Sequence, residues 1–246
     1  MTPPAAPAKA RGNRPFGTPK PLSDGQFKTS LVQRVYETIM ASLDRGELKP
    51  GSRIIALELA QQLGLSRAPV REALAVLAGQ GLVELLPDRG AILRPMNAHD
   101  LAQIYEVIAP VAAVGIRAAT KRIHEGDNAE RVARAMDAID DAAINIAPDF
   151  GFYLVLNDFH YLANSIGERP YVDTLLRSIN IEYWNRMLAG AIDLRVHAAQ
   201  YARTYRRLTD AVLAGDPDSA DAIMHYHAQW CIALLEPGYA SVYRRQ

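Results

Sequence analysis

Residues 65–95 constrain the fold of this chain more than any other segment. Their first half predicts an amphipathic helix that begins after Ser66, because a serine side chain can accept hydrogen bonds from the free amides of a first helical turn. Pro69 is compatible with this helix, since those early amides lack intrahelical partners. Apolar residues at helical spacing predict one buried stripe, formed by Val70, Leu74, Leu77 and Ala78. Arg67 and Arg71 therefore project from the start of the helix.

Two short strand-like runs follow this helix. Gly79 and Gly81 are expected to end it, and the runs then cover residues 82–86 and 91–94. The turn that joins the two runs carries Arg89 at its tip. A helix with arginines at its start, followed by a hairpin with an arginine at its tip, is typical of a winged helix-turn-helix. In that fold the helix contacts base edges in the major groove and the hairpin reaches an adjacent phosphate or groove.

The same region resembles the N-terminal domain of GntR-family transcription regulators. The similarity runs from residue 48 to residue 90 and is strongest over residues 66–74, which read SRAPVREAL. The resemblance implies that arginines of the second helix-turn-helix helix read bases and phosphates, and that the hairpin turn forms the tip of the wing. The DNA-contacting residues implied in this way are Ser66, Arg67, Ala68, Pro69, Arg71, Arg89 and Gly90.

The net charge of the chain is zero, but the charge is unevenly distributed. Residues 1–97 hold 13 lysines and arginines against 8 acidic residues, a net charge of +5. Residues 98–246 hold 14 lysines and arginines against 19 acidic residues, a net charge of −5. A basic part joined to an acidic part indicates that only the first faces the phosphates of DNA.

Composition and cysteine content set the broad class of the protein. The 246 residues suffice for two domains with their own cores, and 49% hydrophobic with 22% charged residues is the composition of an ordinary soluble protein. We find no apolar run of membrane-spanning length and no apolar core of a secretory signal. The single cysteine, Cys231, excludes an intramolecular disulfide. We therefore expect a cytoplasmic protein without membrane partners.

Three domains are expected along the chain. Residues 1–28 are rich in proline, alanine, glycine and basic side chains, and predict a disordered basic tail. This tail is either a solubilising leader or an arm that adds salt-sensitive DNA affinity. Helical periodicity over residues 29–43 and 56–63 completes a winged helix-turn-helix domain at residues 29–97.

Residues 98–246 predict an all-helical domain for effector binding and dimerisation, so that the fold class of the whole chain is mainly α. The helices expected from apolar periodicity cover residues 98–125, 128–146, 148–166, 170–188, 195–213 and 217–235. Breaks are expected at residues 126–127, Gly167, Gly190 and residues 215–217. Helices of this number and length form a bundle.

This helical part resembles the FCD ligand-binding domain, which defines the FadR-like branch of the GntR family. The resemblance rests on residues 104–107, 158–164 and 208–227. It implies a small-molecule site inside the bundle. Members of that branch commonly hold a divalent metal through one aspartate and three histidines, and the metal helps to bind a small carboxylate.

The metal ligands implied by the resemblance are only half present. His160 and His227 fall at two of the four positions, while Leu156 and Tyr205 occupy the other two. Two imidazoles make a poor site for a divalent metal unless Tyr205, Asp158 or a water completes it. No cofactor is therefore certain. The favoured interpretation is a pair of histidines in a polar organic pocket, and a metal on His160 and His227 is the alternative.

The effector pocket is expected to be less polar than in many relatives. Where those relatives carry an arginine after Tyr-Glu-Val, this chain has Ile108. We therefore expect a small organic effector that is a less acidic carboxylate or an aromatic metabolite. The residues predicted to line the pocket are Tyr153, Asn157, His160, Arg186, Tyr205 and His227, with Tyr183, Trp184 and Tyr201 as further aromatic candidates.

Three functions are consistent with these features. The leading one is a ligand-responsive transcription regulator, a repressor that binds a palindromic double-stranded DNA operator as a homodimer and is released by a small metabolite. The second is a metal-dependent hydrolase built on Asp158, His160 and His227 with an accessory DNA-binding module. No nucleophile-base pair accompanies those residues, so we expect no enzyme. The third is an architectural DNA binder without an effector.

Overall fold

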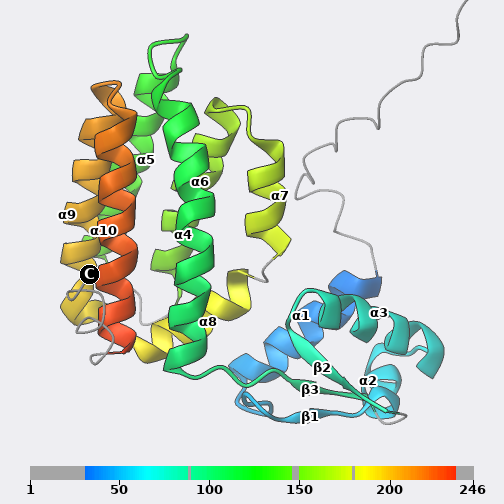
Figure 1. Cartoon of the computed structure of the whole chain (residues 1–246). Coiled ribbons are helices and arrows are strands. Elements are labelled where there is room, and N and C mark those ends of the chain that lie inside the picture. The colour runs from blue at the N-terminus through cyan, green and yellow to red at the C-terminus, as the bar shows by residue number, and fades with distance from the viewer. Residues whose placement is uncertain (1–30, 88–89, 146–149, 179–180, 237–246) are drawn as a thin grey trace, which may run out of the picture.

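The computed structural model describes residues 31–87, 90–145, 150–178 and 181–236. The predicted tail, residues 1–28, lies outside the described residues. Figure 1 shows a small domain with a sheet lying beside a larger bundle of long helices. The mainly α fold class, a winged helix-turn-helix followed by an all-helical bundle, is confirmed.

The small domain combines three helices with a three-stranded antiparallel sheet. Strand β3 lies between the other two strands, with Ile92 opposite Arg53 on one side and Glu84 on the other. The elements are α1 (Leu31–Asp44), β1 (Arg53–Ile54), α2 (Ala56–Leu63), α3 (Arg67–Gly79), β2 (Val83–Leu86) and β3 (Gly90–Leu93). The sequence predicted these helices and the hairpin, but β1 was missed because two residues are too few to show an alternating pattern.

The turn between α2 and α3 has a left-handed glycine at its centre. Gly64 adopts φ 66°, and its backbone amide caps the carbonyl end of α2. Ser66 is the N-cap residue of α3 with an extended backbone, as expected, but its side chain makes no capping hydrogen bond. The predicted position of the N-cap is therefore confirmed, and the predicted hydrogen bond from the first-turn amides to the serine side chain is wrong. The hydroxyl group of Ser66 remains exposed at the start of α3.

Seven helices form the bundle, and α4 lies beside α10 along most of its length (Figure 1). They are α4 (Ala98–Thr120), α5 (Asn128–Ile144), α6 (Gly151–Ile166), α7 (Pro170–Ser178), α8 (Ile181–Ala191), α9 (Leu194–Leu213) and α10 (Pro217–Leu235). The single helix predicted over residues 170–188 was wrong, since the segment forms α7 and α8. Gly190, predicted as a break, lies inside α8. Apolar spacing does not reveal that two successive helices bury their faces against different neighbours.

Helix α4 is the apolar centre of the bundle. By length and composition it is the one helix among the described residues that is apolar enough to span a membrane. This differs from the sequence analysis, which found no such run. Half of the apolar stretch of α4 is buried inside the protein, where the helix packs against α6 and α10. Gly115 lets α6 approach closely, because a Cβ atom there would lie 1.9 Å from the Asn164 side-chain oxygen.

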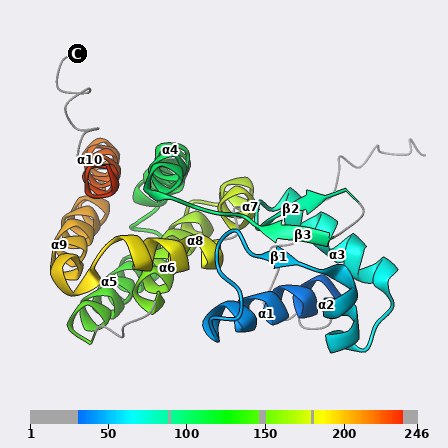
Figure 2. The ribbon, with the colours of Figure 1, turned by 90° about the horizontal axis from the view of Figure 1, so that it is seen from below.

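Helix α8 joins the bundle to the winged domain, as Figure 2 shows where α8 lies next to α1. Tyr183 on α8 is completely buried in the core of the winged domain, and its hydroxyl group donates a 2.5 Å hydrogen bond to the carbonyl oxygen of Arg94. The hydroxyl group of Tyr36 donates to a Glu182 carboxylate oxygen at 2.7 Å. Arg186 forms ion pairs with Asp44 and Glu182. Residues of α8 thus complete the core and the polar contacts of the other domain.

Candidate functional site

The start of α3 presents a polar and basic surface. Ser66, Arg67, Ala68 and Arg71 are exposed, and Pro69 is half-buried. The opposite face of the helix is held in the core through Val70, Ala73, Leu74 and Leu77. Arg67 and Arg71 are one helical turn apart and therefore share the exposed face. The free amides of the first turn add partial positive charge, which favours phosphate at this end of the helix.

The wing is formed by the β2–β3 hairpin, and its geometry depends on Gly90. This residue is half-buried, pairs with Leu86 at the start of β3, and has φ 107°. A Cβ atom at this position would lie 2.1 Å from the carbonyl oxygen of Ile54. Gly90 therefore lets the hairpin pass close to β1. Arg89, predicted at the wing tip, lies outside the described residues.

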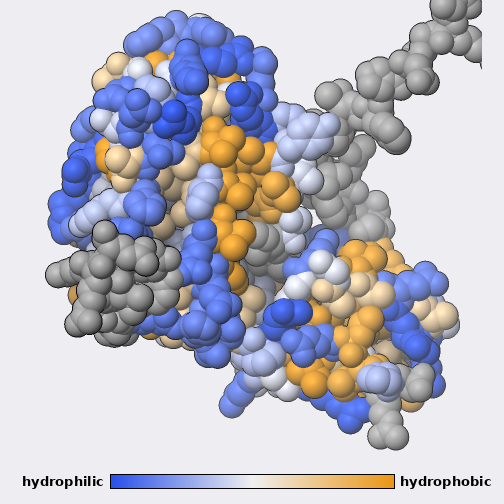
Figure 3. Space-filling model, viewed as in Figure 1, coloured by the Kyte–Doolittle hydropathy of each residue, from blue (hydrophilic) through white to orange (hydrophobic). Residues whose placement is uncertain are grey.

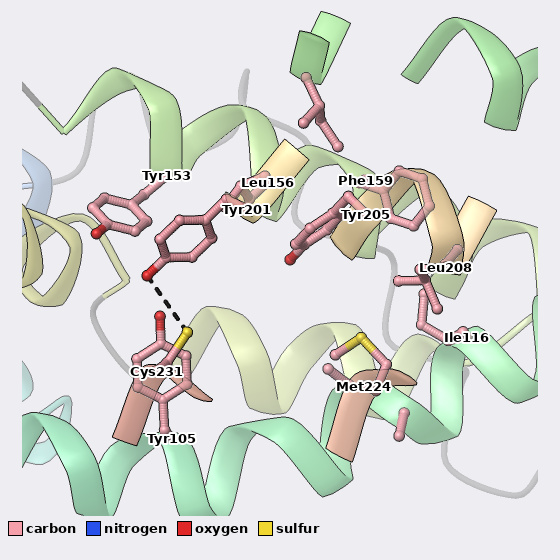
Figure 4. Packing of buried hydrophobic residues seen from close by; sticks show 14 of the residues in the cluster. Tyr105, Ile116, Tyr153, Leu156, Phe159, Tyr201, Tyr205, Leu208, Met224 and Cys231 are labelled. Atoms are coloured by element: carbon pink, nitrogen blue, oxygen red, sulfur yellow. Dashed lines mark hydrogen bonds between the residues drawn. The ribbon is translucent and has the colours of Figure 1, made fainter. Parts of the chain in front are cut away.

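The interior of the bundle holds a cluster of polar and aromatic side chains. We call it the His–Tyr cluster; its members are the buried residues Tyr105, Tyr153, Tyr201, Tyr205, His227 and Cys231 and the half-buried residues Asn157 and His160. His160 Nε2 and the Tyr205 hydroxyl oxygen are 2.8 Å apart, and Cys231 Sγ lies 3.5 Å from the Tyr201 hydroxyl oxygen. Figure 4 shows the hydroxyl groups of Tyr201 and Tyr205 pointing from α9 toward the opposite helices. Helices α4, α6, α9 and α10 therefore converge on one polar centre.

Burial keeps every titratable group of this cluster uncharged at neutral pH. It lowers the pKa of His160 to about 4. The pKa of His227 falls to about 3 through burial first and repulsion by His160 second. Burial raises the pKa of Cys231 to about 12 and raises the pKa values of Tyr105, Tyr201 and Tyr205. The cluster offers hydrogen-bonding groups and no formal charge.

Several buried polar atoms around this cluster have no hydrogen-bond partner among the described residues. They are Asn157 Nδ2, His160 Nδ1, Trp184 Nε1 and His227 Nδ1. Trp184 belongs to the same centre, because its ring packs edge-on against Tyr105 with 5.1 Å between centroids. Buried polar groups are normally satisfied by protein, water or ligand. These groups can therefore hydrogen-bond to water or to a bound small molecule.

The structure brings together five of the six residues predicted to line the pocket. Tyr153, Asn157 and His160 share one face of α6, and Tyr205 and His227 approach from α9 and α10. The sixth, Arg186, lies elsewhere: its guanidinium group binds carboxylates at the junction with α1 and stacks over the Phe150 ring. The prediction for Arg186 was wrong because it assumed one continuous helix, whereas α8 turns this face toward the winged domain.

Sequence reasoning missed two members of this centre, Tyr105 and Cys231, and one buried polar residue of α8, Asn185. Tyr105 was noted only as part of a motif, and Cys231 only for the absence of disulfides. Asn185 was not noticed at all, although it is completely buried. A polar residue at a position where the helical periodicity demands an apolar one would have been the signal.

The residues present do not fit the divalent metal that the family resemblance implies. No group of three or more histidine, cysteine or acidic side chains within the described ranges is arranged to hold a metal ion. Leu156 is packed in the hydrophobic core, and Asp158 is exposed on α6. The Nε2 atom of His160 already faces the Tyr205 hydroxyl group. Two neutral imidazoles without a carboxylate are a weak donor set for such an ion.

A groove of about 690 Å³ runs along the seam between α4 and α10. Tyr105 and Trp230 line this groove, and both also contact the His–Tyr cluster. The Trp230 ring packs edge-on against Tyr201 with 5.0 Å between centroids. The volume is within the range of small-molecule sites in proteins. Two aromatic side chains therefore separate the buried centre from an open groove.

A winged helix with an exposed basic helix start, joined to a bundle with a buried polar centre, defines the class of DNA-binding transcription regulators with a sensor domain. The model of the gntR family of bacterial regulatory proteins matches residues 31–93, and the FCD domain model matches residues 101–229. The chain belongs to the GntR family of transcription regulators, in the branch with an FCD domain, and is not an enzyme.

Relatives of known annotation agree with this assignment. The chain is 26% identical over 200 residues to the "Probable D-xylose utilization operon transcriptional repressor" of Paenarthrobacter nicotinovorans, covering 81% of this chain and 86% of that protein. It is 31% identical to the regulator McbR of Escherichia coli over 107 residues, covering 43% and 48% of the two chains. The solved structure of E. coli McbR/YncC has the same fold, with a TM-score of 0.64 and 23% identity over 86% of this chain and 99% of that one.

Proposed function

We propose that this transcription regulator is a repressor that binds a palindromic operator as a homodimer and is released by a small organic effector. The observation that carries the DNA-reading part is the exposed basic start of α3 on a winged domain. A repressor role is supported by the similarity to the probable D-xylose operon repressor of Paenarthrobacter nicotinovorans. The buried His–Tyr cluster supports an effector site in the bundle. Residues 29–97 would read DNA, and residues 98–246 would bind effector and dimerise in the cytoplasm.

Each residue at the DNA-reading surface has a distinct proposed role. Arg67 and Arg71 project from the exposed face and would contact bases and phosphates in the major groove. Ser66, whose hydroxyl group is not used in a cap, would bind phosphate. Arg89 would reach the neighbouring phosphates from the wing. Gly90 would act through the backbone path of the hairpin rather than by touching DNA.

Replacing Arg67 by alanine is expected to weaken binding to the preferred operator by about 1–3 kcal/mol, or roughly 5- to 150-fold in Kd. The reason is the loss of a bidentate base contact that discriminates between sequences. The measurement is fluorescence anisotropy at fixed salt, on a duplex enriched from a random pool with the wild-type protein and on a scrambled duplex. Arg207→Ala, an exposed arginine on α9, is the control and should leave both affinities unchanged. An equal loss on both duplexes would mean that Arg67 contacts phosphate alone.

The homodimer is supported by an apolar surface on the bundle. Figure 3 shows hydrophobic residues gathered along α4 and toward α7. The exposed residues that form this α4/α7 face are Val107, Val114 and Leu175. Contiguous exposed apolar patches mark interaction sites in soluble proteins. A second copy of the chain is the proposed occupant, because a palindromic operator requires two winged domains related by a two-fold axis.

Replacing Val114 by glutamate is expected to convert the dimer to a monomer of 27.0 kDa. A buried and unpaired carboxylate at the interface costs several kcal/mol, more than a modest interface can tolerate. Light scattering after gel filtration measures the mass, and a gel shift measures the accompanying loss of affinity for the palindrome. Val196→Glu, at an even more exposed valine on α9, should remain dimeric. A wild-type monomer, or a Val114→Glu dimer, would contradict the proposed interface.

A further inference from the structure

We infer that the effector site of this chain operates without a metal ion and accepts an uncharged, hydrogen-bonding aromatic molecule. The inference rests on the proposed effector-responsive function and adds the chemical class of the effector. Three features of the His–Tyr cluster carry it: the way the imidazole nitrogens are used, the absence of buried charge, and the kind of polar atom left without a partner.

One nitrogen of each imidazole, Nε2, already faces a protein group. His160 Nε2 pairs with the Tyr205 hydroxyl group at 2.8 Å. His227 Nε2 lies 3.7 Å from Cys231 Sγ. A metal ion that bound through these two Nε2 atoms would have to displace both neighbours, and Leu156 offers no carboxylate in return. Tyr205 therefore occupies the position of a third histidine ligand, and its hydroxyl group takes up the Nε2 atom of His160.

The interior around the cluster carries no charge that could balance a carboxylate. Among the described residues no lysine, arginine, aspartate or glutamate is buried. Arg186 is held by two carboxylates at the domain junction. Bringing an anion or a cation into this interior would leave it desolvated and unpaired, which is strongly unfavourable. The groove is lined by the acidic residues Glu106 and Asp221 and by none of the lysines and arginines that the structure describes.

The atoms left without partners define what the effector should present. Trp184 Nε1 and Asn157 Nδ2 are donors, and the Nδ1 atoms of His160 and His227 donate or accept according to the tautomer of each ring. An effector with carbonyl, amide or hydroxyl groups can pair with both the donors and the acceptors of the protein. A carboxylate only accepts hydrogen bonds, so it can pair with the protein's donors alone. The rings of Tyr105, Tyr201 and Trp230 pack edge-on against their neighbours, and Tyr105 and Trp230 also line the groove. The site is complementary to a neutral aromatic amide, phenol or ketone.

Metal binding to variants at position 205 tests this inference. Chelator-treated protein is incubated with excess Zn²⁺ or Mn²⁺, passed through a desalting column, and analysed for metal per chain. We expect none on the wild type and none on Tyr205→Phe. Tyr205→His should retain about one Zn²⁺ per chain, because a third imidazole completes a three-histidine site. Circular dichroism and the melting temperature check that each variant is folded.

The outcomes separate the inference from the proposed function. Stoichiometric metal on the wild type would overturn the inference, and so would a folded Tyr205→His variant that fails to bind Zn²⁺. If Tyr205→His does not fold, the metal content of the wild type and of Tyr205→Phe still tests the inference. The DNA affinity of the wild-type protein is measured in parallel. A wild type that does not bind DNA would contradict the proposed function, but the result on metal binding would remain valid.

A ligand panel tests the charge of the effector. Matched aromatic amides and carboxylates, beginning with benzamide and benzoate derivatives, are compared by the rise in melting temperature of the wild-type protein. We expect the compounds that stabilise the protein to be uncharged. In the Trp184→Phe variant, which loses one donor and keeps an aromatic ring, the apparent affinity for these compounds should fall at least tenfold. Stabilisation by the carboxylate member of a pair would overturn the inference.

Discussion

A valine at position 90 is expected to unfold the winged domain and abolish DNA binding. Gly90 has φ 107°, and a Cβ atom there would lie 2.1 Å from the carbonyl oxygen of Ile54 and 3.1 Å from the amide nitrogen of Ala56. Backbone strain of this kind costs about 1–3 kcal/mol, and the steric overlap adds about 1–3 kcal/mol. Both clashing atoms belong to the backbone, so no side-chain rotation relieves them. Urea unfolding and operator binding measure the two consequences.

The matched control is Gly79→Ala at the end of α3. A Cβ atom at position 79 meets nothing within 4 Å, and the backbone there is not left-handed. Its stability should therefore change by no more than about 1 kcal/mol, in either direction. A Gly90→Val variant that unfolds at the wild-type urea concentration and binds the operator normally would show that β1 and the hairpin separate in solution.

Replacing Tyr183 by alanine is expected to destabilise the winged domain and to uncouple it from the bundle. Tyr183 is a completely buried aromatic side chain in the core of the winged domain, yet it belongs to α8. Removing a buried aromatic ring costs about 3–5 kcal/mol. Since the ring is shared between the two domains, calorimetry should show the single wild-type transition separating into an early transition of the winged domain and a later one of the bundle.

Tyr183→Phe separates the ring from its hydroxyl group. This variant loses only the hydrogen bond to the Arg94 carbonyl oxygen. The expected cost is about 1 kcal/mol, with one cooperative transition retained. Equal destabilisation by both variants would assign the effect to the hydrogen bond. An unchanged transition in Tyr183→Ala would mean that the two domains do not share this side chain in solution.

The winged domain could be predicted closely because its signals are local. The apolar stripe of α3 and the glycine turn before it lie within a few residues of each other, and each follows from backbone geometry. The bounds of α2 agree with the predicted residues 56–63. The short strand β1 was beyond such reasoning, since its partner in β3 is more than thirty residues away in the sequence.

The bundle site was predicted in part, for a physical reason. Tyr153, Asn157 and His160 recur on one face of a single helix, so the sequence alone places them together. The position of Arg186 depends on where α7 ends and on the direction that α8 then takes. Neither quantity is encoded in the periodicity of the apolar residues. The same limit hid Asn185, whose burial depends on the packing of α8 against the bundle.

The two faces of α8 have a consequence for the modularity of this regulator. Tyr183 and Trp184 are sequence neighbours, but the first completes the winged-domain core and the second packs against Tyr105 in the bundle. A chimera that joins this sensor to a foreign DNA-reading domain at residue 97 would leave Tyr183 without the core that it completes and Arg186 without Asp44. The boundary between the two domains therefore passes through α8. A foreign DNA-reading domain that is joined to this sensor should carry residues equivalent to Tyr36 and Asp44.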